Sequence, residues 1–106
     1  MKELTGLADL DIALAAGSAV IYKHSTRCGL CDAAIDEVRD FEARGGAMVF
    51  YLDLLEHRDV SDEIARRLGV RHESPQAVVL RDGKVVAVLN HRAVRADALE
   101  KALAGA

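Results

Sequence analysis

The sequence predicts an α/β domain in which a β-sheet is covered by helices on both faces. Helical and strand-like patterns alternate along most of the 106 residues, and the last two strand-like runs are joined by a tight turn. Helices that alternate with strands and end in a hairpin are typical of such a layered sheet. A chain of this length can bury a hydrophobic core without disulfides or structural metal, so we expect one domain over residues 1–106.

Four segments repeat apolar residues at helical spacing. The first is followed by Gly17, which is a suitable helix end. In the third, Ser61 is expected to act as the N-cap and Gly69 to end the helix. The predicted helices comprise residues 5–16, residues 32 to about 44, residues 62–68 and residues from about 95 to 104.

Four short apolar runs are typical of strands buried inside a sheet. The last two flank Arg81-Asp82-Gly83-Lys84, and Asp-Gly between two apolar runs is a strong hairpin signal. The predicted strands comprise residues 19–23, 48–52, 77–80 and 85–89.

Composition and charge exclude several classes of function. The chain is 51% hydrophobic and 29% charged with a net charge of -3, so neither nucleic acid nor an anionic membrane is an expected partner. Asp9 and Asp11 interrupt the apolar residues near the start, which argues against a signal peptide. We expect a monomer in the reducing cytoplasm, where a close cysteine pair is more often catalytic or metal-binding than structural.

The two cysteines of the chain form the motif Cys28-Gly29-Leu30-Cys31, directly after a predicted strand and at the start of a predicted helix. Three interpretations compete: a redox-active pair, half of a metal site, and two inert core thiols. No second cysteine pair is present, and the histidines lack the short spacing of a zinc site. The position between strand and helix favours the redox-active pair, with no metal and no prosthetic cofactor.

In the redox interpretation the two thiols have different roles. Cys28 stands first at the helix start, where unpaired N–H groups and the helix dipole favour a thiolate, so it would attack. Cys31, one turn later, would resolve the mixed disulfide. Arg27 adds a positive charge beside Cys28 that favours the thiolate, although it is also compatible with a solvated loop residue.

Pro75 is the only proline, and it directly precedes a predicted strand. Its peptide bond with Ser74 is a candidate for the cis form, and the alternative is a trans proline that opens an edge strand. His24 lies four residues before Cys28 and His72 three before Pro75, and either could carry protons near a sulfur, as could His91 after the last strand. Each is more often a surface or hydrogen-bonded histidine.

The order of elements, the Cys-x-x-Cys motif after the first strand and the proline before the hairpin together resemble the thioredoxin fold. This resemblance implies a three-layer α/β/α sandwich with a mixed sheet of about four strands. It also implies a cis proline whose loop packs beside the active-site sulfurs, and it nominates Ser74 and Pro75 as site residues, with the backbone of Ser74 contacting a substrate chain.

Within that fold, the chain resembles the monothiol bacilliredoxin family, the YtxJ-like proteins of the bacillithiol system. The resemblance rests on Lys23-His24-Ser25-Thr26-x-Cys28, His72-Glu73-Ser74-Pro75-Gln76, Asp82-Gly83-Lys84-Val85-Val86 and His91. It implies an enzyme that removes bacillithiol, as a co-substrate, from protein mixed disulfides. The residues expected to shape the site around the two cysteines are Thr26, Arg27, Gly29, Ser74, Pro75, His24 and His72.

The chain departs from both patterns. Cys31 stands where the bacilliredoxin motif, of the Thr-Cys-Pro-Ile-Ser type, has a serine, so an intramolecular disulfide becomes possible. The thioredoxin motif Trp-Cys-Gly-Pro-Cys is not met, and Tyr22 stands near the place where thioredoxins carry a buried Asp. Two further hypotheses therefore stay open: a general thioredoxin-like dithiol reductant, and a non-catalytic redox sensor or binding module.

Overall fold

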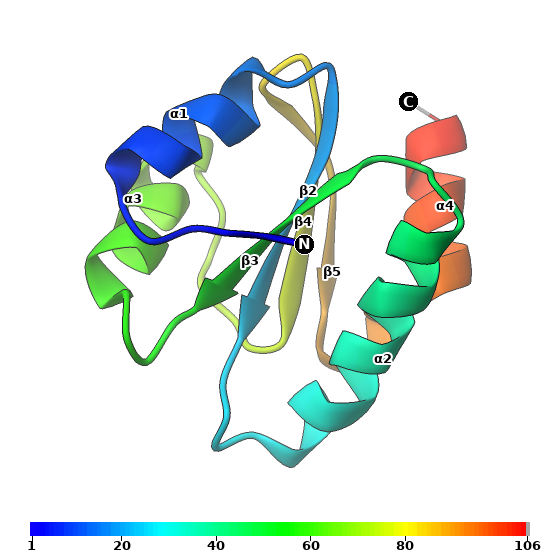
Figure 1. Ribbon diagram of the computed structural model, residues 1–106, viewed down its shortest axis with the longest axis horizontal. Coiled ribbons are helices and arrows are strands. Elements are labelled where there is room, and N and C mark those ends of the chain that lie inside the picture. Colours follow the sequence, from blue (N-terminus) through cyan, green and yellow to red (C-terminus); the bar gives the residue numbers. More distant parts are fainter. Residues whose placement is uncertain (106) are drawn as a thin grey trace.

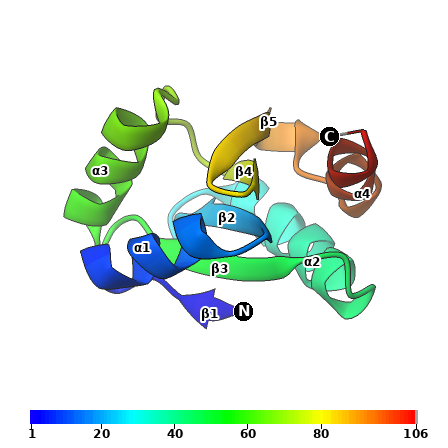
Figure 2. The same ribbon diagram turned by 90° about the horizontal axis from the view of Figure 1, so that it is seen from above.

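The computed structural model describes residues 1–105 and shows a five-stranded mixed sheet between two pairs of helices (Figures 1 and 2). The strands lie in the order β1-β3-β2-β4-β5. β1, β3 and β2 run parallel to one another, and β4 is antiparallel to both β2 and β5. The elements are β1 (Lys2–Glu3), α1 (Leu7–Ala15), β2 (Ser18–His24), α2 (Gly29–Ala43), β3 (Met48–Asp53), α3 (Arg58–Leu68), β4 (Gln76–Arg81), β5 (Lys84–Asn90), the 3-10 helix η1 (His91–Ala93) and α4 (Ala96–Ala104).

The predicted fold class is confirmed, and the sheet has one strand more than the four predicted from the sequence. The extra strand, β1, has only two residues, which is too short to produce an apolar pattern. The predicted single domain of residues 1–106 extends one residue beyond the described part. None of the helices described here combines the length and hydrophobicity needed to span a bilayer.

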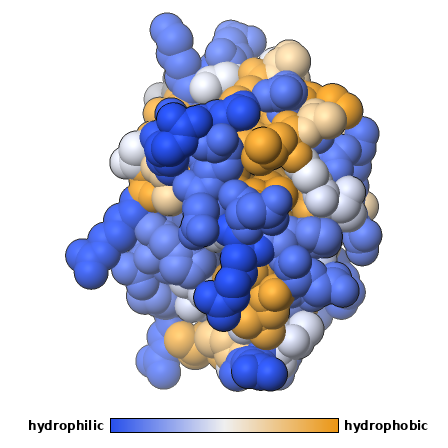
Figure 3. Space-filling model, turned by 90° about the vertical axis from the view of Figure 1, so that its left-hand side faces the viewer, coloured by the Kyte–Doolittle hydropathy of each residue, from blue (hydrophilic) through white to orange (hydrophobic). Residues whose placement is uncertain are grey.

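Each face of the sheet packs against one helix pair, and this divides the hydrophobic core into two layers. Helices α1 and α3 cover one face, where Leu10 and Ile64 are fully buried. Helices α2 and α4 cover the other, where Phe41 and Leu99 are fully buried. On the surface of the α1–α3 side, hydrophilic side chains predominate and apolar groups emerge only in separate patches (Figure 3). The central strand β2 is therefore buried on both sides.

The prediction that Ser61 caps α3 is wrong. The helix begins at Arg58 with His57 in the N-cap position, and Ser61 is a buried residue whose N–H donates to the His57 carbonyl at 3.1 Å. The reason is tertiary packing: Val60 and Ile64 are both buried against the sheet, so the turn before Ser61 must already be helical to place Val60 inward. Burial overrides the capping preference of serine.

Two turn predictions are confirmed. Gly69 ends α3 in the left-handed conformation with φ 63°, where glycine has no steric penalty. In the β4–β5 hairpin, Asp82 and Gly83 have φ 51° and 77°, the positive values that a type I′ turn requires at both central positions.

Replacing Gly83 by alanine should destabilise the fold, because a Cβ there would lie 2.7 Å from the Leu14 carbonyl oxygen and φ is positive. We expect a loss of about 1–3 kcal/mol in the free energy of unfolding, measured by chemical denaturation. Gly17→Ala is the matched control, since its Cβ meets nothing within 4 Å and its φ is not in the left-handed range. Equal stability of the two variants would contradict this reading of the hairpin.

Candidate functional site

Two loops meet at one end of the sheet and carry most of the predicted site. The first connects β2 to α2 and contains both cysteines; the second connects α3 to β4 (Figure 1). The cis peptide bond that the thioredoxin resemblance implies is confirmed between Ser74 and Pro75, directly before β4. Both loops leave the sheet where β2 ends and β4 begins, so residues 46 positions apart, Cys28 and Ser74, belong to one region.

Cys28 occupies the N-cap position of α2 and is partly exposed. Its backbone N–H donates to the Ser25 carbonyl at 3.2 Å, which closes a turn before the helix. No side chain caps the helix start, so the thiol lies beside the unpaired N–H groups of the first turn. These groups and the helix dipole favour negative charge at the start of the helix.

Cys31 is fully buried and lies between the two loops. Its Sγ accepts the backbone N–H of Ser25 at 3.4 Å and lies 3.6 Å from Ser74 Oγ. Burial raises the pKa of Cys31, the contacts from Ser25 and Ser74 oppose that rise, and the neighbouring Cys28 adds to it. Cys31 is therefore a thiol rather than a thiolate at neutral pH while Cys28 is reduced.

An aromatic group lies beneath α2 and connects His24 to the cysteine loop. The rings of Tyr22, His24 and Tyr51 have centroids 5.5 to 6.2 Å apart. Tyr22 Oη lies 2.9 Å from His24 Nδ1 and 3.4 Å from the Cys31 carbonyl oxygen. Both contacts are hydrogen bonds when the Nδ1–H of His24 donates to Tyr22 Oη and the Tyr22 hydroxyl donates to the Cys31 carbonyl oxygen. The His24 side chain is thus connected through Tyr22 to the Cys31 backbone.

The Tyr22 phenol and the His24 imidazole are both neutral at pH 7. Burial raises the pKa of Tyr22, and burial lowers the pKa of His24 despite the opposing charges of Asp53 and Asp32. At the position where thioredoxins are expected to carry an acid, this chain therefore has a neutral phenol that supports the helix backbone.

A second buried polar cluster lies on the opposite face of the sheet. Lys23 is completely buried, and its Nζ lies 3.2 Å from His72 Nδ1; Ser61 Oγ lies 3.4 Å from the same nitrogen. Burial lowers the pKa of Lys23 to about 8, with Asp62 opposing, so it is still mostly an ammonium at pH 7. Burial and the charge of Lys23 together lower the pKa of His72.

These contacts define the state of His72. An ammonium group has only donors, so Lys23 must donate to an unprotonated Nδ1 of His72, and the ring proton is on Nε2. Within residues 1–105, neither His72 nor His24 makes a hydrogen bond to a sulfur atom. Lys23 lies at the end of the predicted strand 19–23 but was not among the predicted site residues, because only the pairing of neighbouring strands shows that its side chain is buried beside His72.

The remaining predicted residues occupy the rim of the site. Thr26, Arg27 and Gly29 are exposed, and Arg27 contributes its backbone N–H to Ser25 Oγ at 3.3 Å. His91 links the end of β5 to the proline loop: its N–H donates to the Pro75 carbonyl at 2.8 Å. The imidazole of His91 also lies 3.0 Å from a carboxylate oxygen of Glu73 in the same loop.

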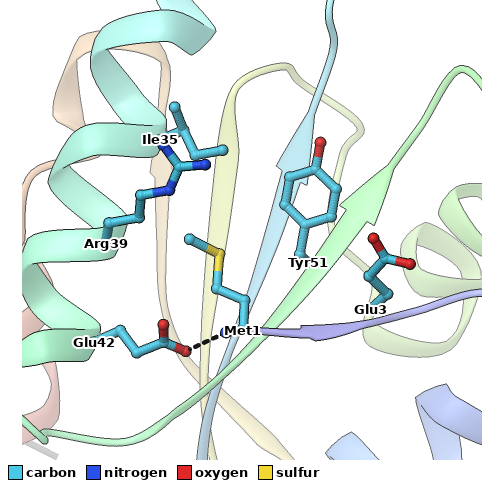
Figure 4. Close-up of a pocket in the computed structure, with 6 residues that line it drawn as sticks. All are labelled: Met1, Glu3, Ile35, Arg39, Glu42 and Tyr51. Atoms are coloured by element: carbon cyan, nitrogen blue, oxygen red, sulfur yellow. Dashed lines mark ion pairs between the residues drawn. The ribbon is translucent and has the colours of Figure 1, made fainter.

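A cavity of about 520 Å³ adjoins α2 on its β1–β3 side (Figure 4). Tyr51 forms one wall and so joins the cavity to the aromatic group, while the amino group of Met1 pairs with Glu42 at 2.8 Å on the other side. Neither cysteine lines it. In the part of the chain that the structure describes, no cluster of three or more His, Cys, Asp or Glu side chains could hold a metal ion.

The fold, the paired thiols and the cis proline define a thioredoxin-fold thiol oxidoreductase. The chain belongs to the monothiol bacilliredoxin BrxC family, whose sequence profile matches residues 2–99, and the family expected from the sequence is confirmed. The family label refers to one thiol, and Cys31 is a second.

Solved structures agree on the fold. A protein described as a candidate oxidoreductase with a thioredoxin fold is 27% identical, with a TM-score of 0.90 over 95% of this chain and 91% of that one. A single-residue variant of thioredoxin from Halobacterium salinarum NRC-1 is 22% identical, with a TM-score of 0.79 over 98% and 88%. Oxidised mitochondrial thioredoxin 3 from Saccharomyces cerevisiae is 21% identical, with a TM-score of 0.75 over 100% and 95%.

Replacing Lys23 by methionine should stabilise the protein most at neutral pH. Below pH 8 Lys23 is an ammonium in both the folded and the unfolded chain, and burial of this charge destabilises the folded chain. Between pH 8 and 10.5 Lys23 is neutral in the folded chain and still protonated in the unfolded chain. The gain in unfolding free energy should therefore be on the order of 1–3 kcal/mol below pH 8 and should shrink toward pH 10.5. Lys84→Met, at an exposed position, is the control, and a gain that is constant with pH would contradict the assignment.

Replacing Ser74 by alanine should raise the pKa of Cys31 further, because the hydroxyl contact that favours the thiolate is lost. The measurement is a titration of thiolate ultraviolet absorbance in a Cys28→Ser background, where Cys31 is the single thiol. Ser18→Ala, at the far end of β2, should leave the titration unchanged. An unchanged titration in Ser74→Ala would mean that Ser74 does not act on the sulfur.

Proposed function

We propose that this protein removes a low-molecular-weight thiol from mixed disulfides on cytoplasmic proteins, with bacillithiol as the thiol, and that it acts as a monomer. The observation that carries the proposal is the unequal setting of the two thiols. Cys28 is partly exposed at a helix start, whereas Cys31 is buried beside the proline loop. An accessible nucleophile with a protected second thiol suits attack followed by resolution.

In the first step the Cys28 thiolate attacks the bacillithiol sulfur of the mixed disulfide. A new disulfide forms between Cys28 and bacillithiol, the original disulfide breaks, and the substrate protein leaves as a thiolate that takes a proton from solvent. Ser74, whose Oγ lies 3.6 Å from Cys31 Sγ, precedes the cis bond to Pro75. This position beside the cysteines supports a role for the loop in contacting the substrate chain. Arg27 and Thr26, exposed before Cys28, are proposed to border the same substrate.

In the second step Cys31 loses its proton to solvent and attacks the Cys28 sulfur, the disulfide between Cys28 and bacillithiol breaks, and bacillithiol leaves as a thiolate that takes a proton from solvent. Cys28 contributes to the raised pKa of Cys31 through both its charge and its hydrogen bond. Both influences end once Cys28 is bound in a neutral disulfide, while the contacts from Ser25 and Ser74 remain. The resolving thiol is therefore activated by the product of the first step. Two electrons from a separate thiol or reductase then return the Cys28–Cys31 disulfide to the dithiol.

A second candidate function is general reduction of protein disulfides in the manner of a dithiol thioredoxin. The buried second thiol, one turn after Cys28, favours it. The neutral Tyr22 beneath α2 counts against it, because no buried carboxylate is available there to relay a proton. Reduction of insulin with a thioredoxin reductase as electron donor would separate this candidate from the first.

Intact mass under non-reducing conditions tests the proposal directly. The reduced protein is mixed with a test protein that carries one bacillithiol adduct. We expect the adduct to leave the test protein and this chain to lose two hydrogens as the Cys28–Cys31 disulfide closes. Cys31→Ser should instead accumulate one bacillithiol on Cys28, and Cys28→Ser should lose activity at least about a hundredfold, as expected for loss of a nucleophile.

Two outcomes would overturn the proposal. One is full removal of the adduct by Cys28→Ser, and the other is retention of the adduct by the test protein with the wild-type chain. In the second case, activity in the insulin assay would move the general dithiol reductant to first place.

A further inference from the structure

A second cavity adjoins the cysteine motif on the α4 side of α2. It encloses about 330 Å³ between the first turns of α2 and the segment that follows β5. Leu30, which stands between the two cysteines and is 41% exposed, forms part of its wall. Ala33 and Val94 add to an apolar floor. The cavity therefore begins two residues after the proposed nucleophile.

The opposite wall is tied to the proline loop. His91 contributes to this wall, and its N–H donates to the Pro75 carbonyl at 2.8 Å while its ring pairs with Glu73. Both walls are thus fixed relative to the loops that surround Cys28. A small group joined to Cys28 through a disulfide has this preformed hollow beside it.

The rim of the cavity carries two guanidinium groups without contact partners. Arg92 and Arg95 line it, and within residues 1–105 neither has a carboxylate oxygen within 4 Å. The charge of Arg95 acts on Asp97, but that carboxylate is paired with Arg44 at 2.8 Å. The carboxylate of the lining residue Glu37 accepts the Ala96 N–H at 3.0 Å and so supports the start of α4.

This charge is unusual for the chain as a whole, which has a net charge of -3. The larger cavity on the other side of α2 has no excess of positive charge. There Glu3 and Glu42 line the walls together with Arg39 and the amino group of Met1, which pairs with Glu42 at 2.8 Å, and Arg39 lies 3.8 Å from Asp36 (Figure 4). Of the two cavities that flank α2, only the one beside Leu30 suits an anion.

We propose that the cavity beside Leu30 binds the anionic end of the low-molecular-weight thiol through its carboxylates. Arg92 and Arg95 pair with the carboxylates, and the apolar floor packs against the carbon chain between the carboxylates and the sulfur. The inference rests on the proposed function and adds the residues that hold the charged end of its co-substrate. Because the arginines are exposed, each pair should change affinity only a few-fold.

The test compares two adducts on one protein. A test protein with a single cysteine is blocked either with 3-mercaptopropionate, which carries a carboxylate, or with 2-mercaptoethanol, which is uncharged. The wild-type chain should show the lower KM for the carboxylated adduct. Arg92→Gln with Arg95→Gln should raise that KM about 3- to 10-fold, leave kcat unchanged and leave the KM for the uncharged adduct unchanged.

A matched control removes the same charge elsewhere. Lys84→Gln with Lys101→Gln changes the hairpin and the last turn of α4, away from the cavity, and should alter neither KM. Equal KM values for the two adducts in the wild-type chain, or equal effects of the two double variants, would overturn the carboxylate site alone. Absence of turnover with both adducts would overturn the proposed function, and the site with it.

Discussion

Strand β2 pairs with β4 in an antiparallel register that places Lys23 opposite Gln76. This register brings the end of β2 and the start of β4 to the same end of the sheet. The loop that follows β2 and the loop that precedes β4 must therefore meet there. The contact between Cys31 Sγ and Ser74 Oγ at 3.6 Å is the local consequence. A shift of one residue would turn every side chain of β2 to the other face, with the buried polar groups separated from their partners.

Three consecutive residues at the end of β2, Tyr22, Lys23 and His24, are polar and buried. Side chains alternate between the faces of a strand, so the first and third lie beneath α2 and the second lies on the α3 side. Each has a partner on its own face, which offsets the cost of burial. None of the buried polar residues in the described part of the chain is a carboxylate. Proton movement at the site is therefore left to the thiols, the neutral histidines and solvent.

Local patterns were sufficient to predict the architecture, because the apolar periods are clear and the Asp82-Gly83 turn requires a specific backbone conformation. They failed where packing decides. Serine is a common helix cap, but α3 begins before Ser61 because its buried face includes Val60 in the preceding turn. Strand β1 has two residues, which is too few to show an alternating apolar pattern. The cysteine motif and Pro75 were predicted as parts of one site. The contact between Cys31 Sγ and Ser74 Oγ depends on the register in which β2 pairs with β4. Neither segment alone determines that register.

The second thiol changes what the site can do while the geometry around it needs no change. The groups that face Cys31 Sγ are the Ser25 N–H and the Ser74 hydroxyl, and these suit a serine oxygen at that position as well as a sulfur. Only sulfur, however, can bond to Cys28, whose carbonyl accepts the Cys31 N–H at 3.1 Å within the same turn. A thiol held in the same turn of the chain acts at a far higher effective concentration than a free thiol. In the function proposed above, Cys31 would then release the small thiol by an intramolecular attack, and an external reductant would restore the dithiol.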